Sequence, residues 1–281
     1  MLKTKLRFFC PVLILFSLSL AAVPSNAEIR EIKSIREVVP SLAEGTLIVF
    51  DIDNTLMAPT GYLGSDEWFY LLYKVYRING ADESGIARTA MDVWNKTQWR
   101  IDVKAVEKET PLLIKKEQAK GNKVMALTAR TFDIADRTIA QLGTIGIDFS
   151  SASVSGKESI FPKTDFKSDD DVLVKKGIIF VGESNVKGKV LAYYLQKMNY
   201  HPKKVVYIDD REKHVKSVSE TLETIGIPCL SFRYGAADEK VKRFNEVFSE
   251  VSVRTKEEEE LSRLFLYGEA APTPGKNTKK E

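Results

Sequence analysis

Three stretches of the chain are continuous runs of apolar, largely β-branched residues that end in a polar side chain. They are residues 46–51 (TLIVFD), 123–128 (KVMALT) and 204–210 (KVVYIDD), and a fourth run, residues 229–233 (CLSFR), follows a Gly-Ile-Pro turn. Runs without polar alternation are typical of strands buried on both faces, as in a parallel sheet between two layers of helices. The pattern therefore predicts four strands of one buried sheet.

Helical patterns separate these runs along the chain. We expect helices after Pro111, over residues 132–142, over 190–197 and over 214–225, the first with Thr110 as its N-cap and Gly121 at its end. Strands that alternate with helices are typical of an α/β fold built on a doubly wound, mainly parallel sheet. We assign residues 28–56 and 110–254 to this core.

Two segments are expected to lie outside the sheet. In residues 57–109, apolar side chains recur twice at helical spacing, which predicts a small helical cap inserted after the first strand. These side chains are Trp68, Phe69, Leu72, Val75, Tyr76, Ile86, Ala90, Val93 and Trp94. Residues 151–182 are loop-rich and acidic, and we expect them to form a second insertion that ends in a hairpin (DVLV, KKG, IIFV).

The first 27 residues have the pattern of a secretory signal peptide. Basic residues are followed by an apolar run from Phe8 to Ala22 and then by small residues up to Ala27. Because this run is shorter than the roughly 20 residues of a membrane-spanning helix, we expect cleavage rather than an uncleaved anchor. The mature chain would then have no membrane anchor and would be exported, to the periplasm or beyond. At the other end, residues 255–281 are charged and then rich in Pro, Gly and Lys, which predicts a flexible tail.

Composition and charge exclude some classes of protein. The chain has 281 residues, 43% of them apolar and 29% charged, which is a globular composition. Three of its 42 basic residues, Lys3, Lys5 and Arg7, lie in the signal segment, so the mature chain balances its 39 acidic residues. A formally neutral protein does not bind nucleic acid through bulk charge, and we expect no nucleic-acid partner. Cys229 is the only cysteine after residue 27, so we expect no internal disulfide.

Polar residues stand at the ends of three of the predicted strands, which is where open α/β sheets bind ligands. Asp51 and Asp53 lie in the sequence DIDNTL. Two carboxylates so close together are unfavourable unless a cation binds them or one keeps a proton, and both conditions suit catalysis. The alternatives are a strand-end turn without chemistry and a calcium loop. The calcium loop is disfavoured because Leu56 stands where that loop needs glycine.

Three further motifs follow in order along the chain. LTAR ends a predicted strand in Thr128, VKGKVL places Lys187 at the opening of a helix, and the pair Asp209-Asp210 ends another strand. Taken singly, each has a plain structural explanation, namely a helix cap, a solvated lysine and an acidic turn. Their joint occurrence in this order is far more specific than any one of them.

Together the four motifs resemble those of the haloacid dehalogenase superfamily of phosphatases and phosphotransferases. The resemblance covers most of residues 46–233, and the predicted cap lies where that superfamily carries its helical cap. FDIDNTL followed by GSDEWF also resembles an uncharacterised group of exported bacterial proteins. For the lysine of the motif set we prefer Lys187 to Lys157 or Lys163, because of its KGxxL pattern and its spacing to Asp209.

The resemblance implies a Mg²⁺-dependent phosphatase that acts on a small phosphorylated substrate. It implies that Asp51 is the nucleophile that forms an aspartyl-phosphate, and that Asp53 is the general acid and base. Thr128 and Lys187 are then the phosphate-binding residues. The implied ligands of the metal ion are Asp51, the main-chain carbonyl of Asp53, Asp209 and Asp210. An acid at position 53 favours hydrolysis or transfer of phosphate over the dehalogenase and ATPase reactions of the superfamily.

Two other functions stay open on these motifs: a phosphotransferase that uses the same site, and an exported binding or effector module of this fold without turnover. Substrate recognition is expected from the cap, with one or two of its aromatic residues at the site and the others in its own core. These aromatic residues are Trp68, Tyr70, Tyr73, Trp94 and Trp99. Arg130 could contact phosphate or form a surface salt bridge, and His214 could bond a metal-bound acid or face solvent.

Overall fold

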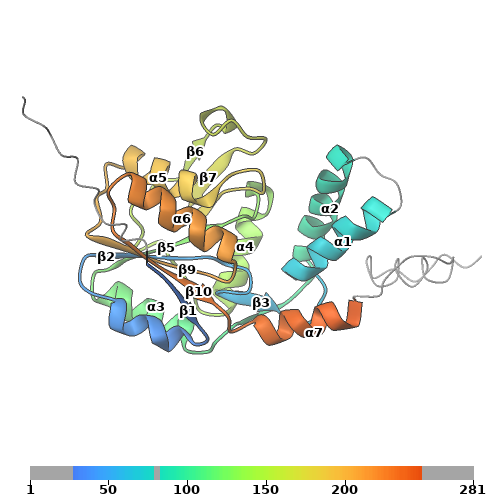
Figure 1. Ribbon diagram of the computed structural model, residues 1–281, viewed down its shortest axis with the longest axis horizontal. Coiled ribbons are helices and arrows are strands. Elements are labelled where there is room, and N and C mark those ends of the chain that lie inside the picture. Colours follow the sequence, from blue (N-terminus) through green and yellow to red (C-terminus); the bar gives the residue numbers. More distant parts are fainter. Residues whose placement is uncertain (1–27, 79–82, 249–281) are drawn as a thin grey trace, which may run out of the picture.

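The computed structural model describes residues 28–78 and 83–248. Within them, a sheet of eight strands forms the centre, in the order β1-β10-β9-β2-β5-β8-β7-β6 (Figure 1). Neighbours from β1 to β8 run parallel, and β7 and β6 complete one edge antiparallel. The strands are β1 (Glu28–Ile32), β2 (Thr46–Phe50), β5 (Lys123–Thr128), β6 (Ser159–Phe161), β7 (Val172–Lys175), β8 (Ile178–Phe180), β9 (Lys204–Asp209) and β10 (Cys229–Tyr234).

Helices cover both faces of this sheet (Figure 1). They are the 3₁₀ helix η1 (Ile35–Ser41) and the α-helices α3 (Thr110–Ala119), α4 (Ala135–Thr144), α5 (Lys187–Lys197) and α6 (Glu212–Thr224). On β2, Leu47 and Val49 share a core cluster with side chains of α5 and α6, whereas Ile48 and Phe50 share another with η1, α3 and α4. All of β2 is buried, which explains why its sequence shows no polar alternation.

The predicted α/β class with a mainly parallel sheet is confirmed. β5 has the predicted bounds, and β10 is one residue longer than predicted. β2 and β9 each end one residue before the predicted end. Asp51 and Asp210 are therefore the first residues beyond their strands, where the backbone is free to turn.

The prediction that residues 151–182 lie outside the sheet is wrong. The predicted hairpin forms as β7 and β8, with Lys176 and Gly177 in left-handed conformations at its turn. However, β8 pairs parallel with β5, and β6 extends the sheet beyond β7. All three residues of β8 are buried. A strand of three residues is too short for its periodicity to distinguish it from an apolar stretch of loop.

The helix starts differ from the predicted ones by up to three residues. α5 begins at Lys187, three residues earlier than predicted, and α6 begins two residues earlier. α3 includes Thr110, so its N-cap is Glu109 and not Thr110 as predicted. The helix predicted over residues 132–142 is split into the 3₁₀ helix η2 (Phe132–Ile134) and α4. Local sequence defines helix interiors better than helix ends.

The elements of the segment between β2 and α3, within residues 57–78 and 83–105, form a separate group at one end of the sheet (Figure 1). β3 (Met57–Pro59) and β4 (Val103–Ala105) pair antiparallel within this segment. Both helices predicted for the segment are present, as α1 (Asp66–Ile78) and α2 (Glu83–Gln98). Their apolar faces form a hydrophobic cluster that also includes Ile134 of η2 and Phe244. We call α1 and α2 the cap helices from here on.

Several elements had no counterpart in the sequence analysis, among them β1 and α7 (Asp238–Phe248). β1 is an edge strand of sequence EIREI with four exposed residues out of five, so it lacks an apolar pattern. α7 contacts α1, and its Phe244 ring meets the Tyr62 ring edge-on with the ring centres 5.5 Å apart. The C-terminal part of the described chain therefore supports the cap helices.

The predicted signal peptide (residues 1–27) and tail (residues 255–281) lie outside the described residues. The division into a core and an inserted cap at residues 57–109 stays a prediction. Among the described helices, none combines the length and the apolar character that crossing a membrane requires.

The contact between α5 and α6 depends on Gly188. A Cβ atom at this position would lie 2.1 Å from the Ser217 carbonyl oxygen and 2.5 Å from Thr221 Oγ1. We expect Gly188→Ala to lower the free energy of unfolding by about 1–3 kcal/mol, the usual cost of overpacking. Gly143→Ala in α4 is the matched control, because among the described residues nothing beyond the local backbone approaches that position within 4 Å. Urea denaturation measures both variants, and equal stability would contradict the prediction.

Candidate functional site

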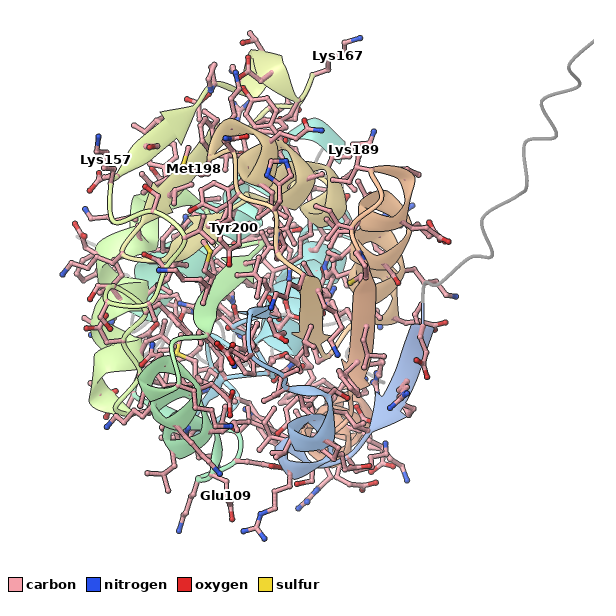
Figure 2. The ribbon with its side chains drawn as sticks, turned by 90° about the vertical axis from the view of Figure 1, so that its left-hand side faces the viewer. Glu109, Lys157, Lys167, Lys189, Met198 and Tyr200 are labelled. Carbon is pink, nitrogen blue, oxygen red and sulfur yellow. The ribbon has the colours of Figure 1, made fainter. Side chains whose placement is uncertain are left out.

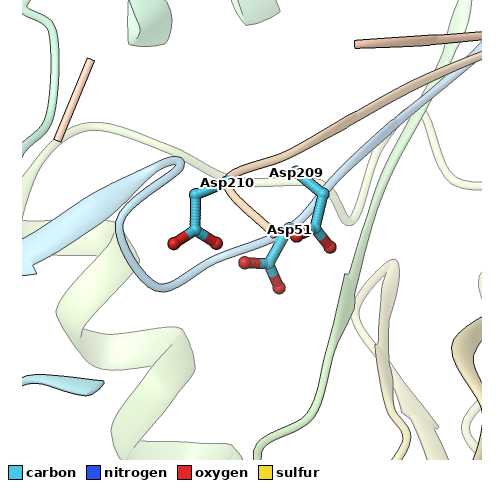
Figure 3. A group of neighbouring side chains, drawn as sticks. All are labelled: Asp51, Asp209 and Asp210. Atoms are coloured by element: carbon cyan, nitrogen blue, oxygen red, sulfur yellow. The ribbon is translucent and has the colours of Figure 1, made fainter. Parts of the chain in front are cut away.

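Three aspartates meet where the neighbouring strands β2 and β9 end (Figure 3). Phe50 is paired with Ile208, which places Asp51 beside Asp209 in the parallel register. One carboxylate oxygen from each of Asp51, Asp209 and Asp210 lies within 4.8 Å of the others. Asp51 is 6% exposed and Asp209 is fully buried. The sheet therefore concentrates negative charge at a place with little access to water.

The DIDNTL loop after β2 is a tight turn closed by its own backbone. The Ile52 carbonyl oxygen accepts the backbone N–H groups of residues 55–57. Asn54 has φ 57°, in the left-handed region that asparagine adopts more readily than most residues. The Thr55 hydroxyl oxygen accepts the backbone N–H of Asp210 at 3.1 Å. The turn therefore holds the first motif against the end of β9.

Lys187 is the lysine that reaches the aspartates. It is 2% exposed, and its Nζ lies 2.5 Å from Asp51 Oδ1 and 2.8 Å from Asp209 Oδ2. The side chains of Lys157 and Lys163, the two alternatives weighed from the sequence, are exposed. Figure 2 shows Lys157 at the periphery of the molecule. Lys187 is placed there because it is the first residue of α5, and α5 begins beside the ends of β2 and β9.

One ammonium group only partly compensates the three carboxylates. Burial raises the pKa of Asp51 to about 7, against the attraction of Lys187. Burial and the charge of Asp209 raise the pKa of Asp210 well above its ordinary value. Burial also opposes ionisation of Asp209 and is the largest single influence on it. The charge and hydrogen bond of Lys187, together with the Tyr207 hydrogen bond and other neighbours, outweigh burial and hold the pKa of Asp209 below its ordinary value. The site therefore favours a further cation, which would stabilise all three charged carboxylates.

Asp209 is held through both of its carboxylate oxygens. Oδ2 accepts hydrogen bonds from Lys187 and from the Tyr207 hydroxyl, and Oδ1 accepts the Arg211 backbone N–H at 2.8 Å. Burial and the charge of Asp209 raise the pKa of Tyr207 well above its ordinary value, so the phenol stays a neutral donor. A carboxylate oxygen has about two lone-pair directions, so Oδ1 can accept one further ligand.

β5 brings Thr128 to the same edge of the sheet, with Arg130 close behind. Thr128 is 1% exposed, and its hydroxyl oxygen accepts the Arg130 backbone N–H at 3.2 Å. Two hydrogen bonds of 2.8 Å join the Arg130 guanidinium to the Asp53 carboxylate. Because Arg130 is 3% exposed, the alternative of a surface salt bridge is wrong, and the pair is internal.

A second arginine joins the core to the cap helices at the mouth of the site. Arg211 forms an ion pair with Asp66, donates to the Tyr70 hydroxyl at 2.7 Å and lies 4.6 Å from the centre of the Tyr70 ring. Burial raises the pKa of Asp66 to about 7. His214 lines the same cavity, and burial together with Lys187 lowers its pKa to about 3, so its ring is neutral. Arg211 and Asp66 escaped sequence reasoning because a contact between core and cap leaves no local pattern.

Two of the five aromatic residues expected in the cap reach the site. Tyr70 and Trp94 line its cavity, whereas Trp68 is fully buried in the cap cluster and Trp99 is 58% exposed. Glu183, which sequence reasoning also missed, lies in the same wall. The cavity between the aspartates and the cap helices has a volume of about 40 Å³, which is room for a few water molecules.

The fold and the site together define an α/β protein with a buried aspartate cluster at the ends of parallel strands, beside helices α1 and α2. The chain belongs to the family described as "Protein of unknown function (DUF2608)", which matches residues 28–264. A relative in Chlamydia trachomatis serovar D is 28% identical over 216 residues, which cover 76% of this chain and 79% of that protein. A relative in Chlamydia muridarum is 27% identical over 234 residues, covering 82% and 85%. Both relatives carry the name "Putative outer membrane protein".

Two solved structures are also similar to the chain. One is titled "Crystal structure of putative beta-phosphoglucomutase from Thermotoga maritima", with 14% identity, a TM-score of 0.34 and coverage of 72% of this chain and 99% of that chain. The other is a hydrolase of the haloacid dehalogenase-like family from Streptococcus pneumoniae, with 12% identity, a TM-score of 0.36 and coverage of 72% and 98%.

The charge of Lys187 makes a testable contribution to stability. We expect Lys187→Met to lower the free energy of unfolding by about 3–5 kcal/mol, because it leaves two buried carboxylates without their cation. Lys189→Met is the matched control, since Lys189 is exposed on the same helix, and we expect a change within about 0.5 kcal/mol. Urea denaturation at pH 7 in the presence of EDTA measures both. A Lys187→Met protein as stable as the control would contradict the prediction.

Proposed function

We propose that the protein is a Mg²⁺-dependent phosphomonoesterase of the haloacid dehalogenase type, acting on a small phosphorylated substrate through an aspartyl-phosphate. The observation that carries this proposal is the buried contact of Lys187 with Asp51, at a point where Asp209 and Asp210 add two more carboxylates. Residues from all four sequence motifs line one cavity. A chance set of motifs would have no reason to converge in this way.

The acidic cluster fits a magnesium ion. Mg²⁺ prefers six oxygen ligands and keeps several of its water molecules. We assign to it one carboxylate oxygen each from Asp51, Asp209 and Asp210, which lie within 4.8 Å of one another, and the main-chain carbonyl of Asp53. When bound, the ion would offset the repulsion between a phosphate dianion and the attacking carboxylate.

Asp51 is the proposed nucleophile, with Asp53 as its acid and base. A carboxylate oxygen of Asp51 bonds to phosphorus while the bond from phosphorus to the ester oxygen breaks, and Asp53 gives a proton to that oxygen. A water molecule then attacks the aspartyl-phosphate and passes a proton to Asp53. Inorganic phosphate leaves, and the Asp51 carboxylate is restored. Lys187 orients this carboxylate through its 2.5 Å contact with Oδ1.

Thr128 and Lys187 are the proposed ligands of the phosphoryl oxygens. The Thr128 hydroxyl accepts the Arg130 backbone N–H and, as a hydroxyl, can still donate its own proton to a phosphoryl oxygen. The alcohol part of the substrate would face the cap helices, which contribute Phe69, Tyr70 and Trp94 to the cavity. The lining of the site therefore favours an alcohol with an apolar or aromatic face.

Two other functions use the same residues differently. A phosphotransferase would pass the phosphoryl group to an alcohol in place of water, and the formation of glycerol phosphate in the presence of glycerol would reveal it. A binding or effector module would hold Mg²⁺ without turnover. The enzyme is favoured because Asp51, Asp53, Thr128 and Lys187, the four residues with a proposed chemical role, all line one cavity. The name of the chlamydial relatives, "Putative outer membrane protein", supports export to the periplasm or beyond.

The first test is hydrolysis of 4-nitrophenyl phosphate by the purified chain from residue 28. We expect turnover with Mg²⁺, none with EDTA, and background rates for Asp51→Asn, since an amide oxygen is a poor nucleophile. Asp102→Asn, at an exposed aspartate, is the matched control and should keep the full rate. A folded protein that binds Mg²⁺ but turns over no member of a broad phosphomonoester panel would overturn the enzyme and support the binding module.

Asp53 gives a second, graded prediction. We expect Asp53→Asn to lower kcat by about 10²–10⁴-fold, the usual contribution of general acid–base catalysis. Steady-state rates at saturating substrate measure this effect, and circular dichroism checks that the variant is folded. A folded Asp53→Asn protein with a normal kcat would exclude Asp53 from the proton transfers.

A further inference from the structure

We infer that Arg130 is a positioning residue that fixes the Asp53 carboxylate and links it to cap helix α2. The inference rests on the proposed role of Asp53 as the acid and base. Arg130 comes two residues after the predicted phosphate ligand Thr128, and its backbone N–H bonds to the hydroxyl of that residue. It therefore touches two of the proposed site residues at once.

The Arg130 guanidinium forms a bidentate ion pair with the Asp53 carboxylate. Nε lies 2.8 Å from Asp53 Oδ2, and Nη2 lies 2.8 Å from Asp53 Oδ1. Such a paired contact defines the plane of the carboxylate as well as its distance. With Arg130 3% exposed, water competes little for either bond. The orientation of Asp53 is thus set by the position of Arg130.

Other contacts of the same guanidinium set that position from two sides. On the core side, Nη1 donates to Thr138 Oγ1 at 3.1 Å and to Gln141 Oε1 at 2.9 Å, both on α4. On the cap side, Nη2 donates to Gln98 Oε1 at 3.4 Å, and the Trp94 ring centre lies 5.0 Å from the guanidinium carbon. Gln98 and Trp94 belong to α2, so this helix provides one side of the environment that positions the Arg130 side chain.

All five N–H donors of the Arg130 side chain thus have a partner. A phosphate oxygen would have to displace one of these buried acceptors, which disfavours the direct contact with phosphate that the sequence left open. A lysine at this position carries the same charge but lacks the planar fork, so it cannot hold both oxygens of Asp53 and both acceptors on α4.

The arrangement couples the cap to the chemistry. If α2 moves away, Arg130 loses the Trp94 ring and the Gln98 acceptor while its bonds to α4 stay. The guanidinium then has more freedom, and Asp53 is held less firmly. A proton donor displaced by about 1 Å loses about 10²-fold in rate. Closure of α2 over a substrate would therefore also bring Asp53 to its working position.

This role can be tested with two phosphate esters whose leaving groups differ in how much they need protonation. Phenolate is a strong base, with a pKa of about 10 as in tyrosine, and needs protonation as it leaves, whereas the nitro group makes 4-nitrophenolate a weaker base. We expect Arg130→Lys to lower kcat/KM by about 10²-fold on phenyl phosphate and by less than about tenfold on 4-nitrophenyl phosphate. This ratio covers the steps up to formation of the aspartyl-phosphate, whereas kcat also includes hydrolysis of that intermediate, which is the same for both esters. Equal losses on the two esters would assign Arg130 a structural role only and overturn the inference.

Arg137→Lys is the matched control. Arg137 lies on α4, the helix that Arg130 contacts, and it likewise reaches the cap segment, where it donates to the carbonyl oxygens of Gln98 and Ile101 at 2.8 and 2.7 Å. Both of these hydrogen bonds end on backbone carbonyl oxygens, and neither involves Asp53. Any loss of activity in Arg137→Lys should therefore be the same on both esters. A loss biased towards phenyl phosphate in this control would show that the bias is not specific to Arg130.

A measurement that needs no turnover separates this inference from the proposed function. If wild-type protein hydrolyses neither these esters nor any member of the broad phosphomonoester panel, the proposed function fails, and hydrogen exchange of Asp53→Asn still decides the link to α2. The substitution leaves the buried Arg130 charge without its partner, so we expect about tenfold faster amide exchange in residues 83–98. Unchanged exchange in this helix would overturn the link between Asp53 and the cap.

Discussion

One buried charge, the ammonium of Lys187 between Asp51 and Asp209, determines how the surrounding elements must pack. An ammonium group that loses its water is stabilised only when partners lie close and well oriented. Those partners come from the ends of two adjacent strands, so α5 has to begin at that point. Gly188, the next residue, lets the same turn of α5 approach the backbone of α6. Charge compensation and the close contact of α5 with α6 thus occur in one helical turn.

The contacts between core and cap follow from the same strand ends. Arg130 lies two residues after Thr128, and Arg211 lies two residues after Asp209. Each arginine pairs with a carboxylate and stacks on an aromatic ring of a cap helix, Arg130 on the ring from α2 and Arg211 on the ring from α1. The strand ends that carry the site residues are therefore followed by the two arginines that hold the cap helices in place. Movement of either cap helix would change the site directly.

The site carries more negative than positive charge, and this excess of negative charge indicates a functional site. Three carboxylates share one ammonium, and His214 adds no charge because burial and Lys187 keep its ring neutral. A purely structural cluster would pair its charges or replace them with apolar side chains. Retained negative charge in a buried place favours a site that takes up a divalent cation. Membership of a family without a described function leaves the geometry as the main guide.

The sequence by itself determined the α/β class, the central strands and the identity of the strand-end polar residues. These features are local, because a strand buried on both faces needs an apolar side chain at every position and a site residue must follow it directly. It could not show that β8 joins the sheet, since three residues carry too little pattern. Nor could local pattern alone bring Lys187 to Asp51 across 136 positions or Arg130 to Asp53 across 77. Only the packing of helices on the sheet decides such contacts. A charged side chain that becomes buried pairs with the opposite charge that the fold brings next to it, and that charge can lie far away in the sequence.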